Sequence, residues 1–290
     1  MKTVARFSSR AWHSAVSWSF AVTALRAGGF LLILPLALRR LSPDELGLWY
    51  LFTSIAELCA FAELGLGLIL GRSASYFMAG VERLPAFGLT LNQPYLDGRP
   101  PNHAGLAALL RFSRRLYVRT IAPIVVAMLV VGLGIVLYKI RAVSGTHLLQ
   151  LLTYGVFAIG TVLSITGGYW SQILVGIGHV RQGQRALLLG LVLNYAVSAT
   201  CLLLGVGMLS LALGQVVLAL TSVAFSRWQV LAALPGISTI GGLEIQFGDL
   251  WPSAWRSALT TFGANMCCQG TLFVSGIVCE IGRASCRERV

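Results

Sequence analysis

Long apolar stretches alternate with short polar segments along this chain. A hydrocarbon core about 30 Å thick needs about 20 helical residues to cross it, so each stretch predicts a membrane-spanning helix. The pattern places spans at 16–38, 47–70, 120–138, 148–176, 186–205, 208–226 and 257–278, the fourth tilted or broken around Gly167 and Gly168. Backbone groups in lipid must pair within their own segment, and the short alternating strands of a barrel are missing. The predicted class is therefore an all-α membrane protein with about seven spans.

Composition agrees with a membrane environment. Of the 290 residues, 56% are hydrophobic and 11% are charged, a balance that would not keep a domain of this size in solution. The formal net charge of +12 would suit a nucleic-acid partner, but the basic residues stand beside the ends of the spans and not on one soluble module. They indicate membrane topology, and nucleic acid is not an expected partner.

Lysine and arginine are divided unequally between the two sides of the membrane. The amino-terminal segment, the long segment after the second span, and the segments after the fourth and sixth spans carry most of them. The opposite segments hold only Arg39, Arg40, Lys139 and Arg141. Because the side richer in basic residues stays in the cytoplasm, we expect a cytoplasmic amino terminus. The first span is full length and lacks a cleavage site, so we expect it to stay in the membrane.

The residue types that usually carry catalysis or bind metals are scattered. The six cysteines show no C-x-x-C spacing, and the four histidines lie apart on termini and loops. The sequence contains neither a Ser-His-Asp set nor a nucleotide-binding glycine loop. It therefore predicts no cofactor, no metal and no enzyme activity.

Charged residues inside the predicted spans are the first candidates for function: Arg26 in the first span, and Glu57 and Glu63 in the second. A charge at mid-membrane costs a few kcal/mol, so each of them needs a purpose. Six helical residues leave the two glutamates about 120° apart, so they do not easily share one partner. Either Arg26 neutralises one glutamate in a buried pair, or it faces a water-filled cavity and binds an anion. In the second case Glu57 or Glu63 couples transport to a proton or cation, or gates the cavity.

A basic helical run precedes the third span. Between about 105 and 119, Arg111, Arg115 and Arg119 recur every four residues among leucines, as in a helix that enters the membrane through its headgroups. We expect these three arginines to contact lipid headgroups. Two roles stay open: anchoring at the membrane surface, or guidance of an anionic headgroup toward a cavity.

The polar segment after the sixth span contains prolines and glycines, which indicate a loop. Because many transporters consist of two repeated bundles, we divide the chain into a six-helix lobe at 1–226, a cytoplasmic interfacial linker at 227–256 and the first helix of a second lobe at 257–279. Residues 280–290 resemble the in-frame translation of a sequencing adapter, and their three arginines would stand on the outer side. We therefore expect a fragment with a non-native tail.

Several motifs of small and apolar residues are similar to a known transporter family. The second span ends in Glu63-Leu-Gly-Leu-Gly67, followed by Arg72, Tyr76, Met78, Ala79 and Gly80. Further motifs are Leu-Gly-Leu-Trp-Tyr at 46–50, Gly-Val-Gly-Met-Leu-Ser at 205–210 and Ser-Gly at 275–276. Together they resemble the oligosaccharide flippases of the polysaccharide-export family, within the superfamily of multidrug, oligosaccharidyl-lipid and polysaccharide exporters. The resemblance covers nearly all of 15–278 and includes no catalytic signature.

The resemblance implies twelve to fourteen helices in two lobes around a cationic cavity, of which this chain would hold the first six-helix lobe and one further helix. It implies translocation of a polyprenyl-pyrophosphate-linked oligosaccharide, such as an O-antigen unit, across the bacterial cytoplasmic (inner) membrane by alternating access. Arg26 matches the position of a cavity arginine, so Arg26 first and Arg72 second are the expected contacts of the pyrophosphate or of an acidic sugar. The implied partners are the lipid-linked glycan, membrane lipids and other polysaccharide-assembly membrane proteins.

Two other functions stay open. A multidrug or metabolite cation antiporter of the same superfamily would bind protons and organic cations through Glu57 and Glu63, although Arg26 in the same cavity disfavours a cationic substrate. A membrane-embedded glycan polymerase or ligase would also bind lipid-linked sugars through arginines. Such enzymes usually have a large periplasmic loop, and the outer loops of this chain are short.

Overall fold

The computed structural model describes residues 15–63, 65–82, 84, 100–140, 147–237, 245, 248, 250–251, 254–261 and 263. These residues form helices and turns without a strand, which confirms the all-α class. Six segments are long and apolar enough to cross a membrane: Ala15–Arg40, Pro43–Glu63, His103–Ile140, His147–Gly176, Val180–Leu203 and Leu209–Ala233. The protein is therefore a multi-pass membrane protein, and the first six predicted spans are confirmed. Most of the seventh lies outside the described residues.

The spans are built from helices α2 (Ala15–Arg40), α3 (Pro43–Ala60), α4 (Leu66–Met78), α5 (His103–Leu116), α6 (Ala122–Ile140), α7 (His147–Gly167), α8 (Tyr169–Gly176), α9 (Val180–Leu203) and α10 (Leu209–Ala233). A 3-10 turn, η1 (Phe61–Glu63), continues α3, and a π-helical turn, η2 (Tyr117–Ile121), joins α5 to α6. α10 continues past the predicted lobe boundary at 226, so the first part of the predicted linker belongs to the sixth span. The predicted tail at 280–290 lies outside the described residues.

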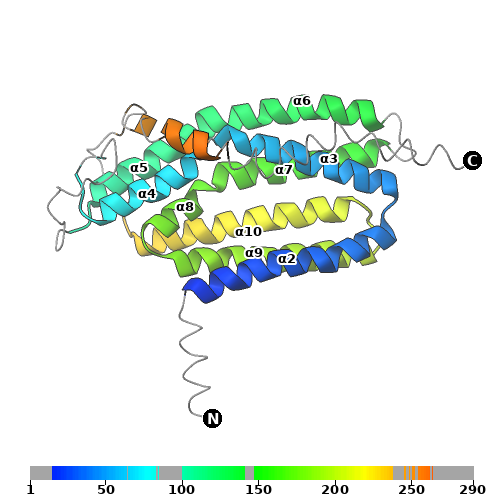
Figure 1. The fold of residues 1–290 in the computed structure, drawn as a ribbon, viewed down its shortest axis with the longest axis horizontal. Helices are drawn as coiled ribbons and strands as arrows, with labels where there is room; N and C mark the ends of the chain where they lie inside the picture. Colours follow the sequence, from blue (N-terminus) through cyan, green and yellow to red (C-terminus); the bar gives the residue numbers. More distant parts are fainter. Residues whose placement is uncertain are drawn as a thin grey trace, which may run out of the picture.

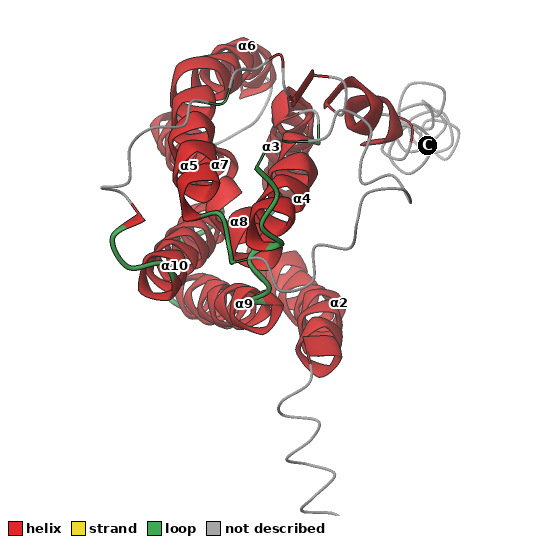
Figure 2. Cartoon of the chain, turned by 90° about the vertical axis from the view of Figure 1, so that its left-hand side faces the viewer, coloured by secondary structure: helices red, strands yellow, loops and turns green. Residues whose placement is uncertain are grey.

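The helices form an elongated bundle (Figure 1). α10 packs against α9 and α7, α9 against α2, α4 against α8 and α5, and α3 against α6. At one end of the bundle α2, α5 and α9 begin and α4, α8 and α10 end, as Figure 2 shows from that end. We call it the basic end, because its helices carry Arg72, Arg111, Arg114, Arg115, Arg181, Arg185 and Arg227.

Local sequence explains where two of the helices start. The Glu45 N–H donates to the Ser42 hydroxyl at 3.2 Å, and the Ser42 N–H donates to the Glu45 carboxylate at 2.8 Å, a capping box that starts α3 directly after α2. Asn102 caps α5 by accepting from the Gly105 N–H at 2.8 Å, while its amide donates to the Val81 carbonyl at 3.1 Å. Asn102 thus ties the start of α5 to the end of α4.

Candidate functional site

Interruptions occur in three of the described spans. After α3 and η1, Gly65 adopts a left-handed φ of 70° at the start of α4. In η2 the Ala122 N–H donates to the Tyr117 carbonyl, five residues back, which widens the helix. The fourth span breaks between Gly167 and Tyr169, as its glycine pair predicts. The other two interruptions are not predicted by the hydrophobic pattern. Interrupted helices are a common feature of transporter binding sites.

Side chains from these three interruptions contact one another. The Tyr117 hydroxyl from η2 donates a hydrogen bond to Glu63 Oε1 in η1. The Tyr117 ring lies 5.2 Å from the Tyr169 ring at the start of α8, centre to centre. Tyr117 is fully buried and Tyr169 is 6% exposed. We call Glu63, Tyr117 and Tyr169 the junction cluster, since it joins the second, third and fourth spans.

Small residues make room for the Glu63 carboxylate. A Cβ added to Gly67 would lie 3.0 Å from Glu63 Oε1 and 3.1 Å from Gln172 Cγ, so any larger residue would press on both side chains. Glu63 is half-buried between the third span, α4 and α8. Within the described part of the chain it forms no ion pair, and Tyr117 is its hydrogen-bond donor. The sequence singled out Glu63, and the structure supplies its partner.

Arg26 and Glu57 lie on the outside of the bundle. At 1.5 Å per residue, each is about 21 Å from the α2–α3 turn along its own helix, so the two charges are at matching depth. Both side chains are exposed, and neither forms an ion pair within the described residues. α2 packs on α9 while α3 packs on α6, which keeps the two helices from pairing along their length. The buried Arg26–glutamate pair is therefore not present in the described structure.

The remaining predicted site residues lie closer to the basic end. Arg72 is exposed on α4 and is not part of the junction cluster. Arg115 and Arg119 are exposed, whereas Ser113 and Tyr117 of the same helical run are fully buried, so the predicted arginine stripe points away from the bundle. Arg111 on this stripe is half-buried. The structure thus places Glu63 among the spans, leaves Arg111 half-buried and leaves the other candidates on the surface.

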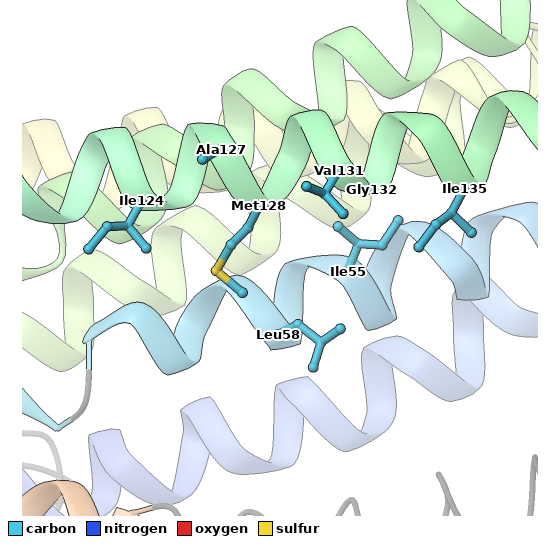
Figure 3. A pocket seen from close by; sticks show the side chains of 8 residues that line it. All are labelled: Ile55, Leu58, Ile124, Ala127, Met128, Val131, Gly132 and Ile135. Carbon is cyan, nitrogen blue, oxygen red and sulfur yellow. The ribbon is translucent and has the colours of Figure 1, made fainter.

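An apolar pocket of about 380 Å³ lies between α3 and α6 (Figure 3). Its lining consists of Ile55, Leu58, Ile124, Ala127, Met128, Val131, Gly132 and Ile135. None of the predicted site residues lines it, and its surface fits a hydrocarbon chain better than a polar group. The pocket therefore does not serve as the site of an anionic headgroup.

Sequence reasoning missed the aromatic members of the junction cluster. Tyr117 and Tyr169 each stand beside a helix interruption, but aromatic residues near span ends are also typical interfacial anchors, so their position alone does not identify them. Among the described residues no three His, Cys, Asp or Glu side chains come together as metal ligands. Comparison with protein-family models, curated proteins and solved structures finds no match to this chain.

Proposed function

We propose that this protein is part of a transporter that moves a polyprenyl-pyrophosphate-linked oligosaccharide across the bacterial cytoplasmic membrane by alternating access. The observation that carries the proposal is the pair of exposed charges at matching depth, Arg26 on α2 and Glu57 on α3. Facing lipid, each would cost a few kcal/mol or more. The surface around each of these two side chains is therefore suited to face water or another polar protein surface.

Arg26 is the proposed contact of the pyrophosphate, because a guanidinium group can offset the lost hydration of phosphate oxygens through paired hydrogen bonds. The lipid tail would stay in the bilayer while the headgroup crosses. Arg72, nearer the basic end, is the second proposed contact. We infer a cytoplasmic location for the basic end from its excess of arginine.

Glu63 and Glu57 are the proposed coupling or gating groups. Among the described residues the Tyr117 phenol is the hydrogen-bond donor to Glu63, so gain or loss of a proton on Glu63 would change this hydrogen bond between η1 and η2. Such a local change at the meeting point of three interrupted spans could bias the bundle between two arrangements.

Replacing Arg26 in the full-length parent tests the function. We expect Arg26→Ala to abolish surface glycan and Arg26→Lys to retain part of it, because lysine keeps the charge but loses the paired donors. Surface glycan is measured by gel analysis of the extracted polysaccharide, with protein levels followed by immunoblot. Arg39→Ala, an exposed arginine at the far end of α2, is the matched control and should behave as wild type. Normal surface glycan in the Arg26→Ala strain would refute the proposal.

A further inference from the structure

The apolar pocket between α3 and α6 is elongated along α6 (Figure 3). Its α6 residues recur at spacings of three and four from Ile124 to Ile135, which places them in one stripe on one face of the helix. At 1.5 Å per residue this stripe is about 16 Å long. Ile55 and Leu58, three residues apart on α3, form the facing wall. The pocket therefore has the shape of a groove between the second and third spans.

The pocket is closed at its base and open at its rim. A Cβ added to Gly132 would lie 2.7 Å from Ile55 Cγ2, so α3 and α6 are in contact at this point. Ile55 and Gly132 are buried, whereas Leu58 is 47% exposed and Val131 is 68% exposed. The buried residues form the base, and the exposed side chains form the rim. The opening therefore faces the surroundings of the bundle and not its interior.

Two flanking charges place the pocket at the depth of the lipid chains. Arg119 and Lys139 lie about 30 Å apart along the third span, and this distance matches the thickness of the hydrocarbon core. The helix between them carries no charged residue. Ile124 is about 8 Å from Arg119 along the helix, and Ile135 is about 6 Å from Lys139. The whole pocket is therefore within the hydrocarbon core when the third span crosses the membrane.

The rim of the pocket is continuous with the apolar surface that α6 presents to the bilayer. Val126, Val130 and Leu137 on the same helix are exposed at this depth. Glu57 follows Ile55 by two residues, which puts the two side chains about 160° apart around α3. The surface that carries Glu57 is thus a different side of α3. The pocket therefore opens onto lipid and not onto the charged surface of the proposed transport path.

The width of the pocket decides what can fill it. A volume of about 380 Å³ over this length gives a mean width of about 5 Å, whereas a helix with its side chains is about 10–12 Å wide. Carbon atoms in contact lie about 3.5–4.0 Å apart, so one hydrocarbon chain fits between the two walls. Another helix could cover the rim, but it could not enter the pocket.

We propose that this pocket binds one acyl chain of a membrane phospholipid. Phospholipids supply the chains that surround the opening, and a chain can enter sideways from the bilayer. It gains no hydrophobic energy there, because it is already in hydrocarbon. Dispersion contacts with the base and both walls hold it, and an unfilled pocket would lack these contacts. The site goes beyond the proposed function, because it does not require that the protein translocates a glycan.

Photolabelling of the full chain in vesicles tests the site. The vesicles contain phosphatidylethanolamine, phosphatidylglycerol and a trace of phosphatidylethanolamine with a diazirine in the middle of one acyl chain, and mass spectrometry of peptides locates the label. Val131 lines the pocket, whereas its neighbour Val130, 62% exposed, does not. We expect at least about threefold more label on Val131, because a chain in the pocket keeps its contacts on several sides.

Two tryptophan variants distinguish the pocket from the general surface of α6. Ala127→Trp places a large ring in the pocket and should remove the excess label on Val131. Val126→Trp adds the same ring at an exposed position outside the pocket and should leave the ratio within about twofold of wild type. If Ala127→Trp fails to fold by circular dichroism, Ala127→Leu replaces it and should lower the ratio by a smaller amount.

Each outcome of the photolabelling decides the proposal. Equal label on Val130 and Val131 in the wild type would show contact with bulk lipid only and would overturn the site. A ratio that Ala127→Trp leaves unchanged, or that both tryptophan variants abolish, would overturn it too. A diazirine amino acid placed at position 131 identifies another occupant. Its crosslinking to a second copy or to residues 257–279, in place of lipid, would show that protein covers the pocket and would refute the acyl-chain site.

Discussion

At the scale of single residues, the hydrogen bond from Tyr117 to Glu63 shows how a charge inside the bundle is accommodated. Glu63 sits where the helix is already interrupted, and Tyr117 comes from the facing interruption in the third span. By contrast, Glu57 remains exposed six residues earlier in α3. Two glutamates of one predicted span therefore have different environments, which sequence spacing does not reveal.

The Tyr117→Phe variant should destabilise the protein by about 1–3 kcal/mol, because a partly buried carboxylate oxygen loses its donor. The thermal unfolding temperature in detergent, followed by circular dichroism, measures the effect. Glu57→Gln, in the helix α3 that leads into Glu63, is the control and should change stability by less than about 0.5 kcal/mol, as expected for an exposed side chain. A Tyr117→Phe protein that melts with the wild type would show that the hydrogen bond does not stabilise the fold.

At the scale of helices, glycine decides where the second span turns. Gly65 has a φ of 70°, and a Cβ at this position would lie 2.7 Å from Thr261 Oγ1 and 3.2 Å from the Ser257 carbonyl oxygen. The helical segment 254–261 therefore packs directly against the interruption in the second span. Gly134, in the continuous helix α6, has open space around its Cβ position.

These two glycines should respond in opposite ways to the same substitution. Gly65→Ala should lower stability by about 1–2 kcal/mol or more, because an L-residue is strained at this φ and the new methyl group meets the 254–261 segment. Gly134→Ala should be neutral or raise stability by up to about 1 kcal/mol through helix propensity. Chemical unfolding of both variants in detergent gives the comparison. Equal stability of the two variants would contradict the left-handed geometry at Gly65.

At the scale of the whole molecule, the uneven charge of the two ends predicts the orientation of the bundle in the membrane. The basic end should be cytoplasmic, because positively charged segments are retained on that side. The α8–α9 turn, with Gly178, is at this end, and the α9–α10 turn, with Gly205, is at the opposite end.

Reporter fusions at these two turns test the orientation. A green fluorescent protein fused after Gly178 should fluoresce, since it folds in the cytoplasm, and alkaline phosphatase fused after Gly205 should be active, since it folds in the periplasm. Each reporter exchanged to the other turn serves as the control and should be silent. The reverse pattern would place the arginines of the basic end outside and would contradict a cytoplasmic basic end.

The first six spans were predicted from the sequence alone. Each crossing of the bilayer needs about 20 consecutive apolar residues, and such a run can be recognised in the local sequence. The same local logic predicted the break at Gly167 and Gly168. In the structure, the turn between α9 and α10 contains Gly205 and Gly207, which have φ of 80° and 71°. Glycine marks such places because few other residues adopt these conformations. The interruption at Gly65 escaped prediction, since glycine in a membrane helix equally often serves close packing.

Only the tertiary structure decided which polar residues meet. The sequence offered Glu57 and Glu63 as possible partners of Arg26. Among the described residues Arg26 forms an ion pair with neither of them, and Glu63 accepts a hydrogen bond from Tyr117. Tyr117 and Glu63 are far apart in the chain, so no local periodicity could connect them. The hydrophobic pattern of the sequence therefore determined which segments cross the membrane. The contacts between helices determined which polar side chains meet.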